Sequence, residues 1–389
     1  MHAFDFNLRH LRAFVAATEC GSLTAAAHVV NLSQSAITQA IAKLELQIEL
    51  PLFERQASGV IPTHAATLLL PRARRALELV ASNRVTASQV RAFVSVAKHG
   101  SYVATAAETG LRQPSLHRSV AQLSATLGQS LFDRRGRGIV LTRRGQAAAT
   151  RFQLAEAELR AAIAELEGLK GREVGRIVIG AMPLCRARLL PRVIAAFHEI
   201  HPEAGVTIVE GSFTEIVGPL RAGEIDLVLG ALRDHEGSDL EQRPLFVDRP
   251  IIVGRHSHPL ARVGEPTSAQ LAQYPWIVAS EGTPLRDRWR HLFGDRAEGP
   301  PNVALESGSV IIARQLLIDD DFLTLLSPDQ VAIDIESGTL AQIGTAREGL
   351  SRTIGMISRA AWRPTKMQQA FVDLVIAQSE QMGTTEAYH

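Results

Sequence analysis

The chain has few cysteines and no long apolar run. Among its 389 residues are two cysteines, Cys20 and Cys185, too few for a disulfide framework or a cysteine zinc site. No apolar stretch reaches the roughly 20 residues that a membrane helix needs. The segment MHAFDFNLRHLRAF also lacks the apolar core of a signal peptide. We therefore expect a protein of the reducing cytoplasm with no membrane partner.

The short motifs that commonly mark catalytic or metal sites are absent from the sequence. It contains no GxSxG, HExxH or GxGxxG motif. HEIH at 198–201 has the wrong spacing for a zinc pair, His256 and His258 precede a proline in a predicted loop, and no histidine is placed to activate Cys185. We expect no enzyme activity, no catalytic or metal-binding residue and no cofactor, with an enzyme on a two-lobed fold as an alternative.

Charge is nearly balanced over the chain but unevenly placed along it. The net charge is +1, yet residues 1–151 contain 18 Lys/Arg and 8 Asp/Glu, a net charge of +10 that leaves −9 for the rest. A basic front on an acidic body indicates an anionic partner for the front, with nucleic acid first among the possibilities. The alternative is a charged surface that serves only solubility.

Residues 11–63 recur without a gap at 90–142, an offset of 79. Arg12-Ala13-Phe14-Val15 matches the segment that starts at Arg91, and Leu52-Phe53 matches the pair at Leu131. A fixed offset over this length indicates a duplication. We therefore predict a first module at residues 1–64, a connecting helix with Pro71 at 65–85, and a second module at 86–145.

Each module is predicted to contain two short helices about a tight turn, followed by a β-prone arm. Ser22 should cap a short helix in the first module, and Asn31 to Ser33 should separate it from the next helix. Pro114 suits the first position of the matching helix in the second module. This layout is typical of a winged helix-turn-helix, whose second helix enters the major groove of DNA.

The first module, SLTAAAHVVNLSQSAITQAIAKLE followed by LPLFER, resembles the winged helix-turn-helix of LysR-type transcriptional regulators. The C-terminal part is similar as well, so the resemblance covers nearly the whole chain. Usual members carry one such module, so the second one is a departure. The resemblance implies a regulator that binds double-stranded DNA as a homodimer or homotetramer and, if it is an activator, contacts RNA polymerase.

Polar and basic side chains at the start of each second helix and in each arm are expected to contact bases or phosphates. In the first module these are Ser33, Gln34, Ser35, Thr38, Gln39 and Arg55; in the second they are Arg112, Gln113, Pro114, Ser115, His117, Arg118, Arg134, Arg135 and Arg137. Residues 86–151 hold ten basic and two acidic side chains, against eight and six in residues 1–85. Our hypothesis is that both modules contact DNA and the second dominates affinity. The alternative is that the first has become a packing or dimerisation element.

Residues 146–172 are predicted to form a linker helix that mediates dimerisation, with a hinge at 168–175. Apolar residues follow the 3-4 spacing of a coiled-coil seam, namely Phe152, Ala155, Leu159, Ala162, Leu166 and Leu169. A two-fold dimer through this seam calls for a near-palindromic DNA site. The alternative is a helix packed on its own domain.

From Arg176 the pattern changes to α/β. Residues 173–380 are predicted to form a two-lobed, periplasmic-binding-protein-like effector domain, followed by a flexible tail at 381–389. RIVIGA, VTIVEG and IDLVLGAL are assigned to a parallel sheet in the first half, and PLFVDRPIIVGRHSH, PWIVAS, FLTLLS and RTIGMISR to the second half. The predicted fold class is thus multi-domain, with two helix-rich winged modules, a linker helix and an α/β effector domain.

Ligands in such folds bind beyond the carboxyl ends of strands, between the lobes. Helix starts at Thr283 and Ser309 favour an anion, and Arg186 and Arg286 could pair with it, so we expect a small carboxylate such as an aromatic or sugar acid. The predicted effector-binding residues are Ala181, Met182, Pro183, Ser212, Phe213, Gly230, Ala231, Thr283, Ser307 and Ser309. The alternative is a DNA-architectural protein without an effector.

Overall fold

A computed structural model describes residues 2–56, 59–136, 138–172, 175–233, 237–294, 301–345, 347 and 349–385. The chain divides into an N-terminal unit, residues 1–175 with two short later segments, and a C-terminal unit that holds most of the remainder. In the described residues, no helix is both long and apolar enough to cross a membrane. Residues 173 and 174 of the predicted hinge and 386–389 of the predicted tail lie outside the described part.

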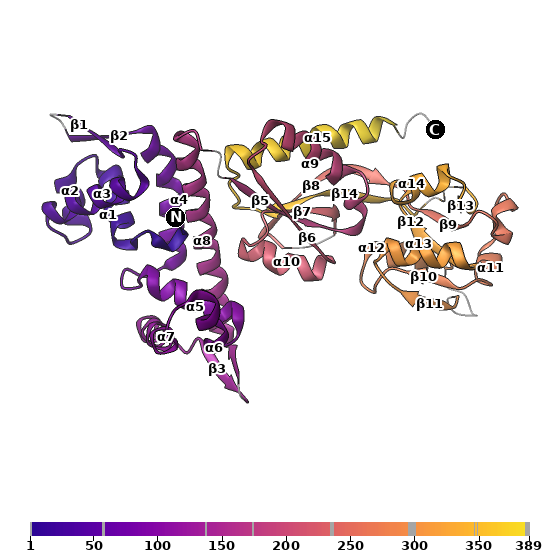
Figure 1. Ribbon diagram of the computed structural model, residues 1–389, viewed down its shortest axis with the longest axis horizontal. Helices are drawn as coiled ribbons and strands as arrows, with labels where there is room; N and C mark the ends of the chain where they lie inside the picture. The colour runs from indigo at the N-terminus through magenta and orange to yellow at the C-terminus, as the bar shows by residue number, and fades with distance from the viewer. Residues whose placement is uncertain are drawn as a thin grey trace. The chain divides into compact units, whose positions relative to one another are not determined.

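The two modules of the N-terminal unit repeat the same elements (Figure 1). The first contains η1 (Ala3–Asp5), α1 (Leu8–Cys20), α2 (Leu23–Val29), α3 (Gln34–Ile48), β1 (Phe53–Gln56) and β2 (Gly59–Pro62); the second contains α5 (Ala87–His99), α6 (Tyr102–Thr109), α7 (Gln113–Leu127), β3 (Phe132–Arg135) and β4 (Gly138–Leu141). Both hairpins are antiparallel with the same register, Phe53 opposite Pro62 and Phe132 opposite Leu141. The predicted cap at Ser22 and the proline in the first turn of α7 are confirmed.

Two long helices, α4 (His64–Val80) and α8 (Arg143–Leu169), join the modules. They run antiparallel, because α4 leads from the first module towards α5 while α8 starts at the second module (Figure 1). Pro71 lies inside α4. One apolar core runs through both modules and includes the facing sides of α4 and α8. The modules therefore share a core instead of being separate domains on a flexible connector.

A buried ion network crosses the contact between α4 and α8. The Arg72 side chain, 5% exposed, donates to Glu165 at 2.9 and 3.3 Å and to Glu158 at 3.1 Å. Burial alone lowers the pKa of Arg72, but the hydrogen bonds and attraction of Glu165 and Glu158 outweigh it and raise that pKa. The guanidinium is therefore charged in the folded chain, and its two partners must stay beside it.

Replacing Arg72 by methionine should destabilise the N-terminal unit strongly. The stem is kept, but Glu158 and Glu165 lose their counter-ion at a site with little water, which costs about 3 kcal/mol. Arg75→Met is the matched control, because Arg75 pairs with Glu78 on the exposed side of α4 and should matter by under about 1 kcal/mol. Urea unfolding followed by circular dichroism measures both variants, and equal effects would contradict the assignment.

Gly145 lets the wing of the second module approach α8 closely. A Cβ at this position would lie 1.9 Å from the carbonyl oxygen of Leu131, a backbone atom that cannot rotate away. The matching residue of the first module is Ala66, which is buried. The two wings therefore sit differently on their helices, and in the second the backbone comes nearer.

Gly145→Ala should lower the melting temperature of the chain. A glycine-to-alanine change inside a helix ordinarily stabilises by up to about 1 kcal/mol, whereas the clash with Leu131 costs about 1–3 kcal/mol. Whether Gly145→Ala raises or lowers the melting temperature therefore shows whether the close contact with Leu131 exists. Gln146→Ala, at the exposed neighbouring position of α8, should change stability by less than about 0.5 kcal/mol. Calorimetry of both variants decides, and stabilisation by Gly145→Ala would refute the close contact.

The C-terminal unit consists of two lobes, each built on a five-stranded sheet. Lobe one has the strand order β6-β5-β7-β14-β8 and lobe two the order β11-β10-β12-β9-β13 (Figure 1). The strands are β5 (Arg176–Ala181), β6 (Gly205–Glu210), β7 (Leu227–Ala231), β8 (Leu240–Asp248), β9 (Ile251–Arg255), β10 (Trp276–Val278), β11 (Val303–Glu306), β12 (Leu323–Leu326), β13 (Leu340–Gln342) and β14 (Arg352–Arg359). The helical segments are η2 (Pro183–Arg186), α9 (Leu189–Ile200), α10 (Phe213–Ala222), η3 (Pro259–Arg262), α11 (Ser268–Leu271), α12 (Pro284–His291), α13 (Val310–Asp319), α14 (Pro328–Glu336) and α15 (Lys366–Thr385).

The assignment of strands to halves was partly wrong. Strands β8 and β14 were placed in the second half, but they pair with each other and β14 pairs with β7, all in lobe one. The buried pair of Arg352 with Asp248, 2.8 Å apart, ties β14 to β8. The chain therefore crosses to lobe two after Asp248 and returns before Arg352. The parallel pairing of β5 with β6 and β7 is confirmed.

Candidate functional site

The leading turns of α3 present an uncharged polar surface in the first module. Ser33, Gln34, Ser35 and Gln39 are exposed. The Ser33 hydroxyl accepts the amide proton of Ala36 at 3.2 Å, and that of Thr38 donates to the carbonyl of Gln34 at 3.0 Å. The amides of Gln34 and Gln39 are thus the groups best placed to read bases. Arg55 lies in β1, and its side chain is outside the described part of the structure.

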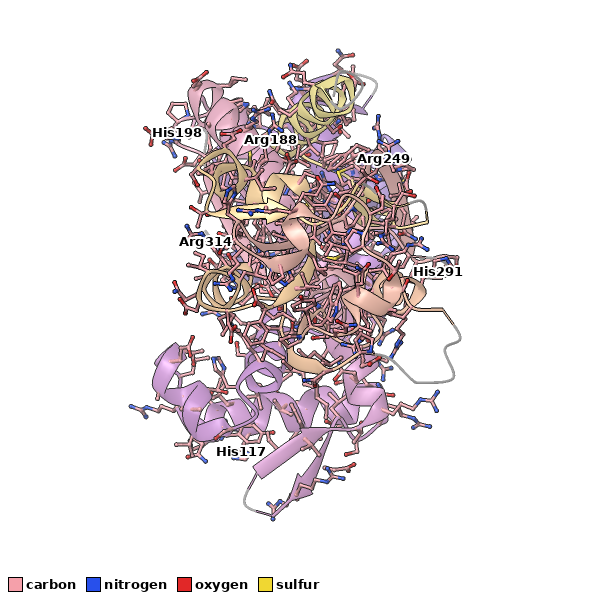
Figure 2. All side chains as sticks on the ribbon, turned by 90° about the vertical axis from the view of Figure 1, so that its right-hand side faces the viewer. His117, Arg188, His198, Arg249, His291 and Arg314 are labelled. Carbon is pink, nitrogen blue, oxygen red and sulfur yellow. The ribbon has the colours of Figure 1, made fainter. Side chains whose placement is uncertain are left out.

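The matching turns of α7 are exposed and carry more positive charge. Arg112, Gln113, Pro114, Ser115 and Arg118 are exposed. His117 lies at the exposed surface of the second module (Figure 2). Its ring stacks on that of Tyr102 in α6, with ring centroids 3.6 Å apart and an interplanar angle of 20°. Partial burial raises the pKa of that tyrosine. The stack fixes His117 in one orientation at the surface of α7.

Unpaired arginines gather on the second module. Arg118 of α7 and Arg134 and Arg135 of β3 are exposed, and none forms an ion pair with a described residue; Arg137 lies outside the described residues. In the connecting helix α4, by contrast, Arg74 pairs with Glu19 and Arg75 with Glu78. The second module therefore has more exposed arginines without an ion pair than α4 has, a difference that residue counts alone do not show.

On the lobe-one side of the inter-lobe region, most predicted effector contacts are buried. The side chains of Ala181, Met182, Phe213 and Ala231 are at most 9% exposed and belong to the apolar core of lobe one, and Met182 packs over Gly230. Pro183 and Ser212 are half-buried. The amide and hydroxyl of Ser212 both donate to Glu215 at 2.7 Å, which lowers the pKa of that carboxyl. This helix start therefore already holds a carboxylate.

On the lobe-two side, the predicted helix caps are confirmed. The Thr283 hydroxyl accepts from the amide of Arg286 at 3.3 Å and donates to the carbonyl of Ser280 at 2.7 Å. Ser309 caps α13, and its own amide donates to the hydroxyl of Ser307 at 3.1 Å. The starts of α12 and α13 are thus each organised by hydroxyl groups, which leaves amide donors of their first turns available.

Arg186 and Arg286, expected to pair with an anionic ligand, each already pair with carboxylates of the chain. Arg186 pairs with Glu210 at the end of β6. Arg286 is buried against Trp289 and pairs with Glu281 at 3.1 Å and with Glu306 at 3.7 Å. Their partners are distant in sequence or lie in a loop, so local spacing gave no sign of them.

Arg233, which the sequence did not single out, bridges the two lobes. It follows β7 by two residues, its guanidinium lies 4.6 Å from the ring centroid of Phe213, and it donates to the Gly282 carbonyl of lobe two at 2.9 Å. The structure gives it no carboxylate partner among the described residues. In the sequence, the one sign of this role is that Arg233 lies two residues beyond the buried strand β7. A second bridge joins Arg188 of lobe one to Asp329 of α14 at 2.9 Å.

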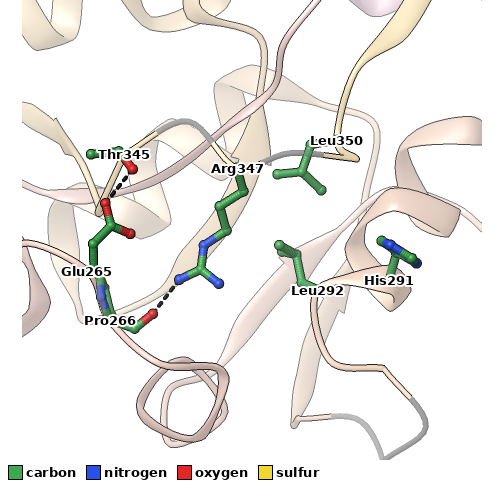
Figure 3. Close-up of a pocket in the computed structure, with 7 residues that line it drawn as sticks. All are labelled: Glu265, Pro266, His291, Leu292, Thr345, Arg347 and Leu350. Carbon is green, nitrogen blue, oxygen red and sulfur yellow. Dashed lines mark hydrogen bonds between the residues drawn. The ribbon is translucent and has the colours of Figure 1, made fainter.

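A cavity of about 490 Å³ lies elsewhere in lobe two. It is lined by Glu265, Pro266, His291, Leu292, Thr345, Arg347 and Leu350 (Figure 3). Arg347 donates to the carbonyl of Pro266, and Thr345 to Glu265. The cavity adjoins the carboxyl end of α12, whereas Thr283 stands at its amino end, so it is distinct from the region between the lobes.

Comparison with known families identifies both parts of the chain. The model of the bacterial regulatory helix-turn-helix of the LysR family matches twice, at residues 8–67 and 87–146, and that of the LysR substrate binding domain matches 170–380. The chain belongs to the LysR family. It is therefore a DNA-binding transcriptional regulator with an effector-binding domain, and not an enzyme.

Individual relatives agree with this membership. The LysR chain is 34% identical over 368 residues to the transcriptional regulator GalR of Pseudomonas putida, covering 91% of this chain and 92% of GalR. It is 30% identical to the SDS degradation transcriptional activation protein of a Pseudomonas species, over 74% of this chain and 94% of that protein. Full-length OxyR of Pseudomonas aeruginosa, with a TM-score of 0.55 at 19% identity, covers 75% of this chain and 94% of its own; it shares the fold.

The apolar seam of α8 in this LysR regulator is occupied within the chain. Phe152, Ala155, Leu159, Ala162 and Leu166 are buried in the core that α4 completes, and Leu169 is partly exposed. The prediction of a helix with these residues on its buried face is confirmed. The prediction that a second chain covers this face is wrong, because α4 of the same chain packs against it. The spacing of Leu69, Ala73, Ala76 and Val80 in α4 is the sequence signal that could have revealed this partner.

Removing the unpaired arginines of the second module should weaken DNA binding and its dependence on salt. The slope of log Kd against log salt should fall by about 0.9 for each phosphate contact that Arg118→Gln, Arg134→Gln or Arg135→Gln removes. Fluorescence anisotropy with a labelled duplex at several salt concentrations measures this slope. Arg75→Gln is the control, since Arg75 is paired with Glu78; an equal fall there would contradict a specific role for the second module.

Proposed function

We propose that this regulator responds to a small carboxylate bound between lobe one and lobe two, with Arg233 as its principal charged contact. The observation that carries the proposal is a guanidinium without a described acid partner, lying on Phe213 and reaching Gly282 of the other lobe. A carboxylate is the natural partner for such a group. Amide and hydroxyl groups at Thr283 and Ser309 can complete its hydrogen bonding.

Movement of the lobes would carry the signal. Two polar contacts bridge them in the described structure, Arg233 with Gly282 and Arg188 with Asp329. An effector that binds the guanidinium of Arg233 replaces its hydrogen bond to Gly282 by a contact through the ligand. The effector thereby stabilises a different relative position of the two lobes. Linkage then requires DNA to change effector affinity by the same factor as the effector changes DNA affinity, worth about 1–3 kcal/mol.

For DNA, we propose that both modules contact the same duplex and that the second supplies most of the non-specific affinity. The exposed amides of Gln34 and Gln39 support a reading role for the first module, and the unpaired arginines of the second support the larger phosphate contribution. Such a regulator acts on cytoplasmic DNA. Two or more copies of the chain can then associate through surfaces other than the occupied seam of α8.

Arg233→Gln should weaken binding of the effector, and the stabilisation that it gives, by more than tenfold in affinity. A thermal-shift screen of small organic acids against the wild-type chain first identifies a stabilising acid. The same acid should then give less than a tenth of its wild-type affinity for Arg233→Gln, since a charge-assisted pair worth about 1.5–3 kcal/mol is lost. Isothermal titration calorimetry measures both affinities.

Arg243→Gln is the matched control, because Arg243 is an exposed arginine of β8 in the same lobe and has no ion pair with any described residue. It should bind the acid as the wild type does. An acid that stabilises all three chains equally would place the effector elsewhere, with the cavity at Arg347 as the first alternative. Stabilisation by neutral compounds alone would overturn the anionic effector.

A further inference from the structure

The two modules are equivalent in backbone structure. The helices α1 and α5, α3 and α7, and the hairpins β1–β2 and β3–β4 begin and end at positions related by the offset of 79. Thr63 and Thr142 both cap the helix after the wing, and their hydroxyls donate to the carbonyls of Pro51 and Ser130 at 2.7 and 2.9 Å. The second helix and the wing therefore begin, end and pair at equivalent positions in both modules, although the second wing lies nearer its following helix at Gly145.

The same face of the same helix is buried in both modules. Leu69, Ala73, Ala76 and Val80 of α4 match Ala148, Phe152, Ala155 and Leu159 of α8 at the offset of 79, and all eight are buried. Because the two helices are antiparallel and use equivalent faces, the modules are related by an approximate two-fold axis through their contact. A two-fold relation of this kind normally joins two subunits, and here it lies within one chain.

Several polar contacts hold this pairing at its edges as well as at Arg72. Arg12 of α1 donates to the carbonyls of Ser82 and Asn83 in the connection to α5, at 2.6 and 3.3 Å. Asp5 pairs with Arg91 of α5 at 3.3 Å. At the other end, Lys170 donates to the carbonyl of Ile48 at the end of α3 at 3.3 Å. Asp5–Arg91 and Lys170–Ile48 each join elements of the two modules, and Arg12 anchors the connection between them.

We infer that a single copy of this chain reads two half-sites on one duplex, the first through α3 and the second through α7. The approximate two-fold axis puts α3 and α7 at opposite ends of the α4–α8 pair, with the wings β1–β2 and β3–β4 beside them (Figure 1). Two recognition helices so related suit two half-sites of opposite orientation on DNA. This inference rests on DNA binding by the family. It goes beyond DNA binding because it assigns both half-sites to one copy of the chain and not to two.

The DNA partner is a duplex whose two half-sites differ in sequence. The two second helices differ at most of the positions expected to contact DNA. At the offset of 79 the first module has Ser33, Gln34, Ser35, Thr38 and Gln39 where the second has Arg112, Gln113, Pro114, His117 and Arg118. The glutamines at the second position match, so both half-sites can share an adenine contact. Arg118 in place of Gln39 favours guanine in the half-site read by α7. The near-palindromic site predicted for an interchain seam is replaced by an asymmetric one.

Selection from random double-stranded DNA tests this inference with the full-length chain. The selected wild-type sites should contain two unlike halves in opposite orientation. Repeating the selection with Gln34→Ala should relax base preference about tenfold in one half only, and with Arg118→Ala in the other half only. Both residues are exposed, so the variants should fold; Arg75→Gln should select the wild-type sites.

The outcomes distinguish failure of the one-chain inference from failure of sequence-specific DNA binding. Palindromic sites in which each variant relaxes both halves together would overturn the inference, because they require one module from each of two chains. Sites unaffected by Gln34→Ala would also overturn it, by removing the first module as a reader. Failure of the wild-type chain to enrich any sequence would instead contradict sequence-specific binding. Native mass spectrometry of the chain on a selected duplex should show one chain for each pair of halves.

Discussion

The contact of α4 with α8 around the buried Arg72 determines the rest of the N-terminal unit. A guanidinium out of water is stable only while carboxylates face it, and Glu158 and Glu165 do so only when their turns of α8 lie beside Arg72 of α4. The apolar stripes supply most of the driving force, but similar stripes can pair in more than one way. The ion network selects the observed pairing. The ends at which α3 and α7 are presented follow from that choice.

Duplication within one chain removes a constraint that a symmetric dimer cannot escape. In a homodimer every substitution in the reading helix appears in both half-site contacts, so the two readers remain identical. In this chain the two proposed reading helices are separate segments and have diverged in charge, with Gln39 in α3 where Arg118 stands in α7. The cap of the second helix has diverged too: Ser33 caps α3 through its hydroxyl, whereas Arg112 makes no such bond at α7. The divergence lies at positions proposed to face DNA, while the faces through which α4 and α8 pack remain apolar.

The sequence predicted local structure well and non-local partners poorly. The repeat, the caps at Ser22, Thr283 and Ser309, and the inner face of α8 were all correct, because each depends on residues a few positions apart. Periodicity marks a buried face without naming what covers it, so α4 was missed as the partner of α8, and Phe93 of α5 as the partner of Phe152. For the same reason β8 and β14 were placed in the wrong lobe, and Glu210 and Glu306 were not foreseen as partners of Arg186 and Arg286. Arg233 was overlooked because its role depends on Phe213 and Gly282, which only the folded lobes bring near.

Charge pairing inside the C-terminal unit limits the charge of the effector proposed to bind between the lobes. Glu210 neutralises Arg186, Glu281 and Glu306 surround Arg286, and Glu215 occupies the start of α10. A second negative charge on the ligand would meet these carboxylates, and the repulsion would offset the gain at Arg233. A monoanion whose apolar body lies against the Phe213–Arg233 pair avoids that cost. Such a ligand can still drive the switch, because the shift in a two-state equilibrium depends on the difference in contacts between states and not on total charge.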